Sequence, residues 1–353
     1  MRNQTFRSYF AYAILALAIA SGCTKKKEEK NEVDPNAYLQ VSDVQHKKFY
    51  FSRGAEDASS DNLIGAVPGF SQDFGVVEAR VTESELQFIQ VFVPNGRTAT
   101  NQVIASYKIT DHFDIQNDTN DFGEKTHKIV EDRKRPWDQR KYMRVDWATP
   151  TNNLSGFASS MVGVKGLEEN TVLLETAKIE PGHISFLVET SVLGSRVTYR
   201  THLTAAKPSD YKPIAYSLKD FEKFGYFYTQ QNFEDMEKGL RDDGIKRFAE
   251  TFNVCEASGA GSCATNKITW VLSKDFPEFY KDETKRAIAE WNKVFQEALG
   301  RTDTVVDLDT TVQADISDSR RNVINMFMHE VSFKGLLGVA QGIKDPETGE
   351  VIS

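Results

Sequence analysis

The sequence is poor in cysteine and histidine and lacks the short motifs of several common enzyme classes. It holds three cysteines and six histidines in 353 residues. It contains no Gly-x-Ser-x-Gly turn and no phosphate-binding loop, so nothing in it indicates the hydrolases and nucleotide-binding enzymes that depend on these motifs. A positive net charge is also absent. The formal value is −8, which argues against nucleic acid as a general partner, because phosphate binding needs a positive field.

The apolar stretch near the start is too short to cross a membrane as a helix. It covers residues 11–20, whereas a transmembrane helix needs about 20 apolar residues. The stretch follows Arg2 and Arg7 and ends on Ala20-Ser21-Gly22-Cys23, a pattern typical of a signal peptide with a bacterial lipobox. Lipoprotein processing attaches a diacylglyceryl group to the Cys23 thiol and makes this residue the new N-terminus. An ordinary signal peptide with an incidental cysteine is the alternative.

The lipobox predicts where the protein resides. Residues 1–23 are interpreted as a lipoprotein signal peptide and residues 24–37 as a flexible tether of mixed charge. The predicted partner is therefore a membrane, reached through the N-terminal lipid, and the predicted location is the cell envelope. Thr24 after the cysteine resembles the pattern of sorting to the outer membrane, on its periplasmic or its surface face.

The other two cysteines, Cys255 and Cys263, flank a loop of small residues. In an exported protein, a pair this close in sequence and without a nearby histidine predicts a disulfide. Two free thiols are one alternative. A metal site is another, although two ligands do not complete a cage.

Residues 38–205 are predicted to form a β-rich domain, either a sandwich or a barrel-like sheet. Short apolar strands recur about every dozen residues with polar connections between them. The predicted strands cover residues 48–51, 76–81, 86–93, 103–109, 141–147, 171–175, 184–189 and 196–200. The second and third of these are predicted to pair across the polar residues 82–85. Residues 206–265 are interpreted as a linking segment that carries the Cys255–Cys263 loop.

Residues 266–353 are predicted to form an α/β subdomain. A strand over 268–272 precedes an amphipathic helix, with Asp275 as its cap and Gly300 at its end. Apolar residues recur in this helix at three- and four-residue steps. Further strands are predicted over residues 305–308, 323–328 and, more weakly, 338–343. The fold class is therefore α+β.

Several stretches carry a resemblance to a known family. They are Ile268-Thr269-Trp270, Trp291-Asn292 with Phe295, the terminal Asp345-Pro346-Glu347-Thr348-Gly349-Glu350, and residues 109–115, 135–147 and 224–229. Together they resemble the N-terminal portion of metzincin-type zinc metalloproteases. The resemblance is closest to a family of large secreted bacterial zinc-dependent metalloproteases, many of them lipoproteins. It implies that residues 266–353 are an incomplete metzincin-like subdomain and that the family hydrolyses peptide bonds.

The resemblance implies zinc as the family's cofactor. In the family, a His-Glu-x-x-His helix follows the terminal turn and supplies two ligands and the general base. Residues 1–353 do not contain this motif, so this stretch is expected to be truncated, to bind no zinc and to be proteolytically inactive. By resemblance, the segment Gly338-Val339-Ala340-Gln341-Gly342 would be an edge strand that docks a peptide or protein substrate. The alternative function is a non-catalytic envelope lipoprotein that binds a partner or peptide through its β domain.

Four smaller groups of residues are considered as sites for a metal ion or an anionic surface. His329-Glu330 begins like a zinc motif, but Phe333 stands where the second histidine is needed. The other groups are the acidic residues Asp307, Asp309, Asp315 and Asp318, the strand-end trio Asp111, His112 and Asp114, and the basic run Arg133-Lys134-Arg135. The first of these three predicts either a calcium site or a solvated loop. The second predicts either a metal site or a hydrogen-bonded cluster. The third predicts either a solvated loop or contact with an anionic surface.

Overall fold

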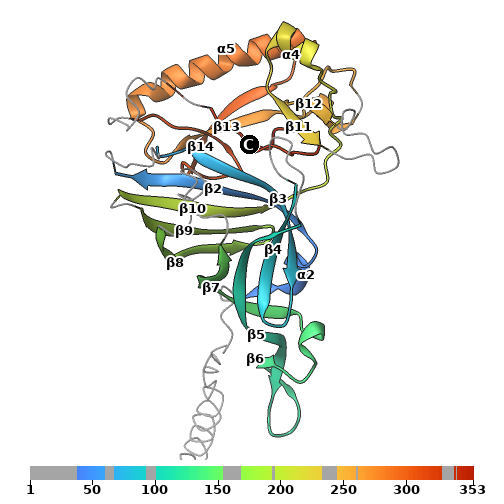
Figure 1. Cartoon of the computed structure of the whole chain (residues 1–353), viewed down its shortest axis with the longest axis vertical. Coiled ribbons are helices and arrows are strands. Elements are labelled where there is room, and N and C mark those ends of the chain that lie inside the picture. Colours follow the sequence, from blue (N-terminus) through green and yellow to red (C-terminus); the bar gives the residue numbers. More distant parts are fainter. Residues whose placement is uncertain are drawn as a thin grey trace, which may run out of the picture. The chain divides into compact units, whose positions relative to one another are not determined.

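The computed structural model describes residues 38–59, 67–92, 101–153, 168–192, 195–232, 245–259, 261–327, 338 and 340–353 (Figure 1). The chain divides into two compact units. The described part of the smaller one is Ile115–Asp132, and the larger one comprises Asn36–Asp114 and Arg133–Ser353. The predicted signal peptide, with Cys23, and the whole predicted tether lie outside the described residues. Among the helices that the structure does describe, none has the length and hydropathy needed to span a bilayer.

The larger unit is built on one antiparallel sheet with the strand order β1-β7-β5-β4-β3-β2-β10-β9-β8. Its elements are β1 (Leu39–Gln40), the short helix α2 (Val41–Val44), β2 (Lys48–Ala58), β3 (Ser71–Val81), β4 (Glu85–Phe92), β5 (Val103–Thr119), β7 (Tyr142–Asn153), β8 (Glu168–Glu180), β9 (His183–Val192) and β10 (Ser195–Ala205). A short 3-10 turn, η2 (Trp137–Gln139), precedes β7. The predicted β-rich domain and the predicted pairing of β3 with β4 are confirmed.

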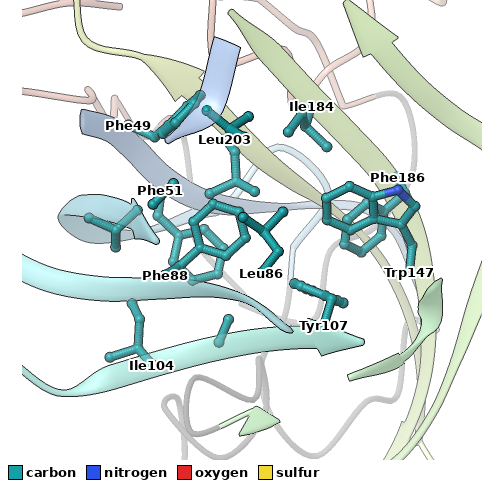
Figure 2. Close-up of a cluster of buried hydrophobic side chains, with 14 of the residues drawn as sticks. Phe49, Phe51, Leu86, Phe88, Ile104, Tyr107, Trp147, Ile184, Phe186 and Leu203 are labelled. Atoms are coloured by element: carbon teal, nitrogen blue, oxygen red, sulfur yellow. The ribbon is translucent and has the colours of Figure 1, made fainter. Parts of the chain in front are cut away.

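The sheet is nearly closed and barrel-like, and it encloses an aromatic core (Figure 2). Alternate side chains of the strands point inward, as in the run Phe49 and Phe51 of β2. Trp147 of β7 and Phe186 of β9 come from opposite ends of the strand order, yet their ring centroids lie 5.6 Å apart. The sheet therefore curls until its two ends share one core. Burial of each large side chain contributes about 1.5–3 kcal/mol.

The described part of the smaller unit is a hairpin. The end of β5 pairs with β6 (Lys125–Asp132). The side-chain oxygen of Asn120 accepts hydrogen bonds from the backbone of Phe122 and Glu124, at 3.0 and 2.9 Å. Gly123 adopts the positive φ that this turn requires.

The linking segment contributes a short helix and a two-stranded sheet. These are α4 (Leu218–Phe224) and the antiparallel pair β11 (Tyr228–Asn232) and β12 (Ile245–Ala249). The turn η3 (Ser262–Ala264) follows. The predicted disulfide is confirmed, because the sulfurs of Cys255 and Cys263 are bonded and their Cα atoms lie 5.3 Å apart.

The last third forms a parallel sheet in the order β14-β13-β15, with the helix α5 packed on it. The elements are β13 (Ile268–Ser273), η4 (Glu278–Tyr280), α5 (Lys281–Leu299), β14 (Val306–Ala314) and β15 (Asn322–Ile324). Ile288, Phe295 and Leu299 form the stripe of α5 that faces this core. Gly300 ends the helix as predicted, with φ +61°.

Two predictions for this part are wrong in detail. Asp275 does not cap α5, because the 3-10 turn η4 intervenes and the helix starts at Lys281 without a side-chain cap. The strand predicted over 323–328 is shorter, since β15 covers Asn322–Ile324 and residues 325–327 are irregular. Among the described strands, β15 pairs with β13 along these three residues.

Candidate functional site

The predicted docking strand over 338–343 is not formed by the described residues Gly338 and Ala340–Ile343. Val339 and the segment 328–337, with His329, Glu330 and Phe333, lie outside the described residues. Glycines at 338 and 342 weaken a strand, because they lack side chains to pack. The side-chain oxygen of Gln341 instead accepts a hydrogen bond from the backbone of Ser71, at 2.5 Å. Substrate docking by this segment stays a prediction.

The terminal Asp-Pro-x-Thr-Gly-Glu stretch forms a tight turn. The carboxylate of Asp345 accepts hydrogen bonds from the backbone of Glu347 at 2.8 Å and of Thr348 at 3.1 Å. Gly349 has φ +81°, and a Cβ at this position would lie 2.6 Å from a backbone oxygen of Ala249. The Asp345 side chain therefore binds the backbone amides of the turn, whereas Gly349 provides the positive φ and the close approach to Ala249 that a side chain would prevent.

The turn is fixed to three separate parts of the larger unit. The Tyr50 hydroxyl of β2 donates to Asp345 Oδ2 at 3.0 Å, and the Gln231 amide of β11 donates to the Pro346 carbonyl at 2.8 Å. The Val351 backbone donates to the Thr251 carbonyl at 2.9 Å. This single turn thus joins the β-rich sheet to the linking segment.

The surroundings of the turn are acidic and partly shielded from water. Burial raises the pKa of Asp73 to about 6 and raises the pKa of Glu350 above its usual range. Burial and the nearby Asp345 carboxylate also raise the pKa of Tyr50. Lys344 forms an ion pair with Glu250 at 2.6 Å and supplies positive charge in this cluster. The raised pKa values of Asp73 and Glu350 favour the protonated, neutral form of these carboxyl groups beside the turn.

A second polar cluster lies where the segment between β14 and β15 meets the sheet. Ser317 Oγ donates to Glu56 Oε1 at 2.8 Å, and Arg200 Nε donates to the same oxygen at 2.6 Å. His202 Nε2 lies 3.3 Å from Ser317 Oγ. Gly54 permits this contact, because a Cβ there would lie 2.5 Å from the Ser317 Cβ.

Serine, histidine and carboxylate meet in this cluster, but their order differs from a catalytic triad. In a triad the carboxylate orients the histidine, and the histidine accepts the serine proton. Here the Ser317 hydroxyl donates its hydrogen bond to the Glu56 carboxylate, so the serine oxygen is left to accept from His202 Nε2. His202 Nδ1 is buried without a hydrogen-bond partner. The cluster therefore links the segment between β14 and β15 to strands β2 and β10 of the sheet.

Two histidines of this region are held neutral. The rings of His183 and His202 lie 5.4 Å apart. Burial lowers the pKa of His183 to about 4 and that of His202 to about 3. The nearby Arg320 guanidinium contributes to both shifts, whereas Asp318 opposes them. Both rings are neutral near pH 7 as a consequence.

The strand-end trio around His112 is an ion-pair network. Arg133 and Arg144 pair with Asp111, and Arg135 donates to Asp114 at 2.7 Å. His112 is buried, and its Nε2 donates toward the carbonyls of Thr82 and Glu83, each at 3.2 Å. The hydrogen-bonded cluster is the alternative that the structure favours. Two arginines of the predicted basic patch are also bound within this network.

The four acidic residues do not converge on one point. Asp315 pairs with Lys178 and Lys274, and Asp318 pairs with Arg320. The carboxylate of Asp309 accepts hydrogen bonds from the backbone and the hydroxyl of Thr311 in the same strand, β14. Within the described ranges, no three histidine, cysteine, aspartate or glutamate side chains are placed to hold a metal.

Comparisons of the chain with family models, with curated proteins and with solved structures find no match.

Proposed function

We propose that this chain is an exported, lipid-anchored protein of the zinc metalloprotease-like family that its sequence resembles. Residues 1–23 would be its lipoprotein signal peptide and Cys23 its lipidated N-terminus. The β-rich domain would precede the opening part of a metzincin-like subdomain, residues 266–353. Peptide-bond hydrolysis is the activity of the family in this proposal, and a peptide or protein is its substrate.

One observation supports the proposal: residues that carry the family resemblance also connect the elements of residues 266–353 to one another. Ile268-Thr269-Trp270 begins β13, the central strand of the parallel sheet. The Asn292 side-chain oxygen accepts hydrogen bonds from the backbone of Val305 at 2.8 Å and of Val306 at 3.0 Å, which ties α5 to β14. Asp345 organises the terminal turn. A strand, a helix and a parallel strand in this order support an α/β peptidase subdomain.

Zinc chemistry is assigned to the family and not to the residues described here. A catalytic zinc needs about three protein ligands and an open position. The His-Glu-x-x-His motif does not occur in residues 1–353, and the described side chains offer no ligand set.

The activity test uses purified protein with residues 1–353 and a casein substrate. The proposal expects no zinc-dependent cleavage above a buffer control. The matched control is a sample treated with a metal chelator and then resupplied with zinc. Cleavage that disappears with the chelator and returns with zinc would show that these residues contain a complete metal site, contrary to the proposal.

The anchor test compares the wild-type precursor with Cys23→Ala in a Gram-negative host. Wild-type protein is expected to incorporate a labelled fatty acid and to fractionate with the outer membrane. The variant is expected to lose the label, because alanine has no thiol to accept the diacylglyceryl group. Equal labelling of both proteins would show that Cys23 is not the lipidated residue.

A further inference from the structure

Six large apolar side chains are exposed within residues 214–227. This segment includes the helix α4, which is labelled in Figure 1. We call this group the α4 aromatic surface: Ile214, Leu218, Phe221, Phe224, Tyr226 and Phe227. Their exposed fractions range from 43% for Phe221 to 81% for Phe227. Single exposed apolar residues are common, whereas several gathered on one short segment point to an interaction site. Two of them are in contact, because the Phe224 and Tyr226 rings stack with their centroids 6.2 Å apart.

The backbone beneath the surface is firmly held. Ser217 and Asp220 form a capping box at the start of α4, and Gly225 ends the helix with φ +69°. The buried Tyr216 accepts a hydrogen bond from the backbone of Tyr226 at 3.0 Å. The side chains are thus presented on an ordered backbone, so binding through them costs little additional backbone order.

Cations are interleaved with the aromatic residues. Lys212, Lys219 and Lys223 are exposed on the same segment, and Lys223 Nζ lies 4.7 Å from the centre of the Phe224 ring. The Asp220 carboxylate is engaged by the backbone and hydroxyl of Ser217, at 2.8 and 2.6 Å. Glu222 is the other acidic residue of this segment and is exposed, so three lysines against two carboxylates leave residues 211–227 with a net charge of +1. Aromatic rings beside lysines suit the boundary between the headgroups and the acyl chains of a bilayer.

We propose that the α4 aromatic surface inserts into the interface of a lipid bilayer that contains anionic headgroups. The rings would enter the acyl boundary, and the lysines would contact the headgroup phosphates. The inference rests on the proposed function in one respect, because the lipid on Cys23 would bring the chain to a membrane. A second contact would then orient the body of the protein against that membrane. Insertion itself needs no acyl chain.

The test uses the mature chain from residue 23 with Cys23→Ser, so neither the signal peptide nor a lipid can hold it to a vesicle. Binding is measured by cosedimentation with vesicles of phosphatidylethanolamine and phosphatidylglycerol. The chain is expected to bind. Phe224→Ser combined with Phe227→Ser is expected to weaken partitioning by about tenfold or more, because two rings lose their apolar environment.

The matched control is Phe279→Ser combined with Trp291→Ser. These side chains are 66% and 59% exposed but belong to η4 and α5. This control is expected to bind vesicles like the parent, and circular dichroism checks that all variants are folded. The inference is overturned if the parent does not bind, if the Phe224/Phe227 variant binds equally well, or if sedimentation velocity shows that the surface joins two copies of the chain.

The vesicle experiment and the test of lipid on Cys23 can succeed or fail independently of each other. Native protein without lipid on Cys23, together with vesicle binding that requires the α4 aromatic surface, would refute the anchor and support the insertion. Lipid on Cys23 without such binding would support the anchor and refute the insertion.

Discussion

Acid is expected to destabilise this protein through two buried histidines. The pKa values of His183 and His202 are lowered to about 4 and about 3 in the folded chain, whereas an unperturbed histidine has a value near 6.5. Below about pH 6.5 the unfolded chain therefore binds more protons than the folded chain. The stability that depends on neutral rings is complete above about pH 6.5 and is lost as the pH falls toward the folded values.

The linkage relation gives the size of the effect. Between about pH 8 and about pH 5, each histidine lowers the free energy of unfolding by about 2 kcal/mol. Asp73 acts in the opposite direction, because its pKa is raised to about 6. The folded chain takes up that proton first as the pH falls, which restores about 1 kcal/mol by about pH 5. The expected net loss is about 3 kcal/mol, a large fraction of the 5–15 kcal/mol typical of a domain.

Urea unfolding followed by tryptophan fluorescence, repeated over this pH range, measures the loss. The variant with His183→Gln and His202→Gln has lower stability at about pH 8 but lacks both titrating rings. Its free energy of unfolding is expected to stop falling on acidification. His127→Gln, at an exposed position of β6, controls for the substitution itself. Parallel pH dependences for the parent and the double variant would refute the reasoning.

Three substitutions test the packing, each by the same unfolding assay. Gly54→Ala places a methyl group 2.5 Å from a side chain of the segment between β14 and β15, so a loss of about 1–3 kcal/mol is expected. An unchanged midpoint would contradict that contact. Gly349→Ala is expected to cost more than Gly300→Ala, because both have positive φ but only Gly349 approaches another backbone. Equal losses would show that the turn is not tightly packed. Replacing Cys255 and Cys263 by serine is expected to cost about 2–3 kcal/mol, and no loss would contradict a stabilising disulfide.

The strands were predictable because their signal is local. Several strands of the curled sheet alternate buried and more exposed residues, as β4 does with the buried Leu86 and Phe88, and this alternation is readable in the sequence. Apolar alternation does not reveal a strand where polar residues are buried. The predicted strand over 48–51 is therefore too short, because β2 continues through the buried Ser52 and Arg53 to Ala58. A barrel-like sheet could not be told from a sandwich, because the contact between Trp147 and Phe186 joins distant strands.

The helix α5 and the polar clusters were also predictable only where the signal is local in the sequence. The end of α5 was predictable from Gly300, whose positive φ is a local property. Its start was not, because the turn after Pro277 first closes as a 3-10 helix. Glu56, His202 and Ser317 come from separate parts of the sequence, so no spacing reveals their cluster. The Asp-Pro-x-Thr-Gly-Glu motif did indicate its turn, because aspartate, proline and glycine act on their own backbone.

The most direct test of the central claim, a lipid-anchored protein, is the intact mass of the native protein extracted from its own membrane fraction, with sequencing of its N-terminal peptide. The account predicts that the mature protein begins at Cys23 and that this residue carries a diacylglyceryl group. A mature protein that begins at another residue, or an unmodified Cys23, would contradict it.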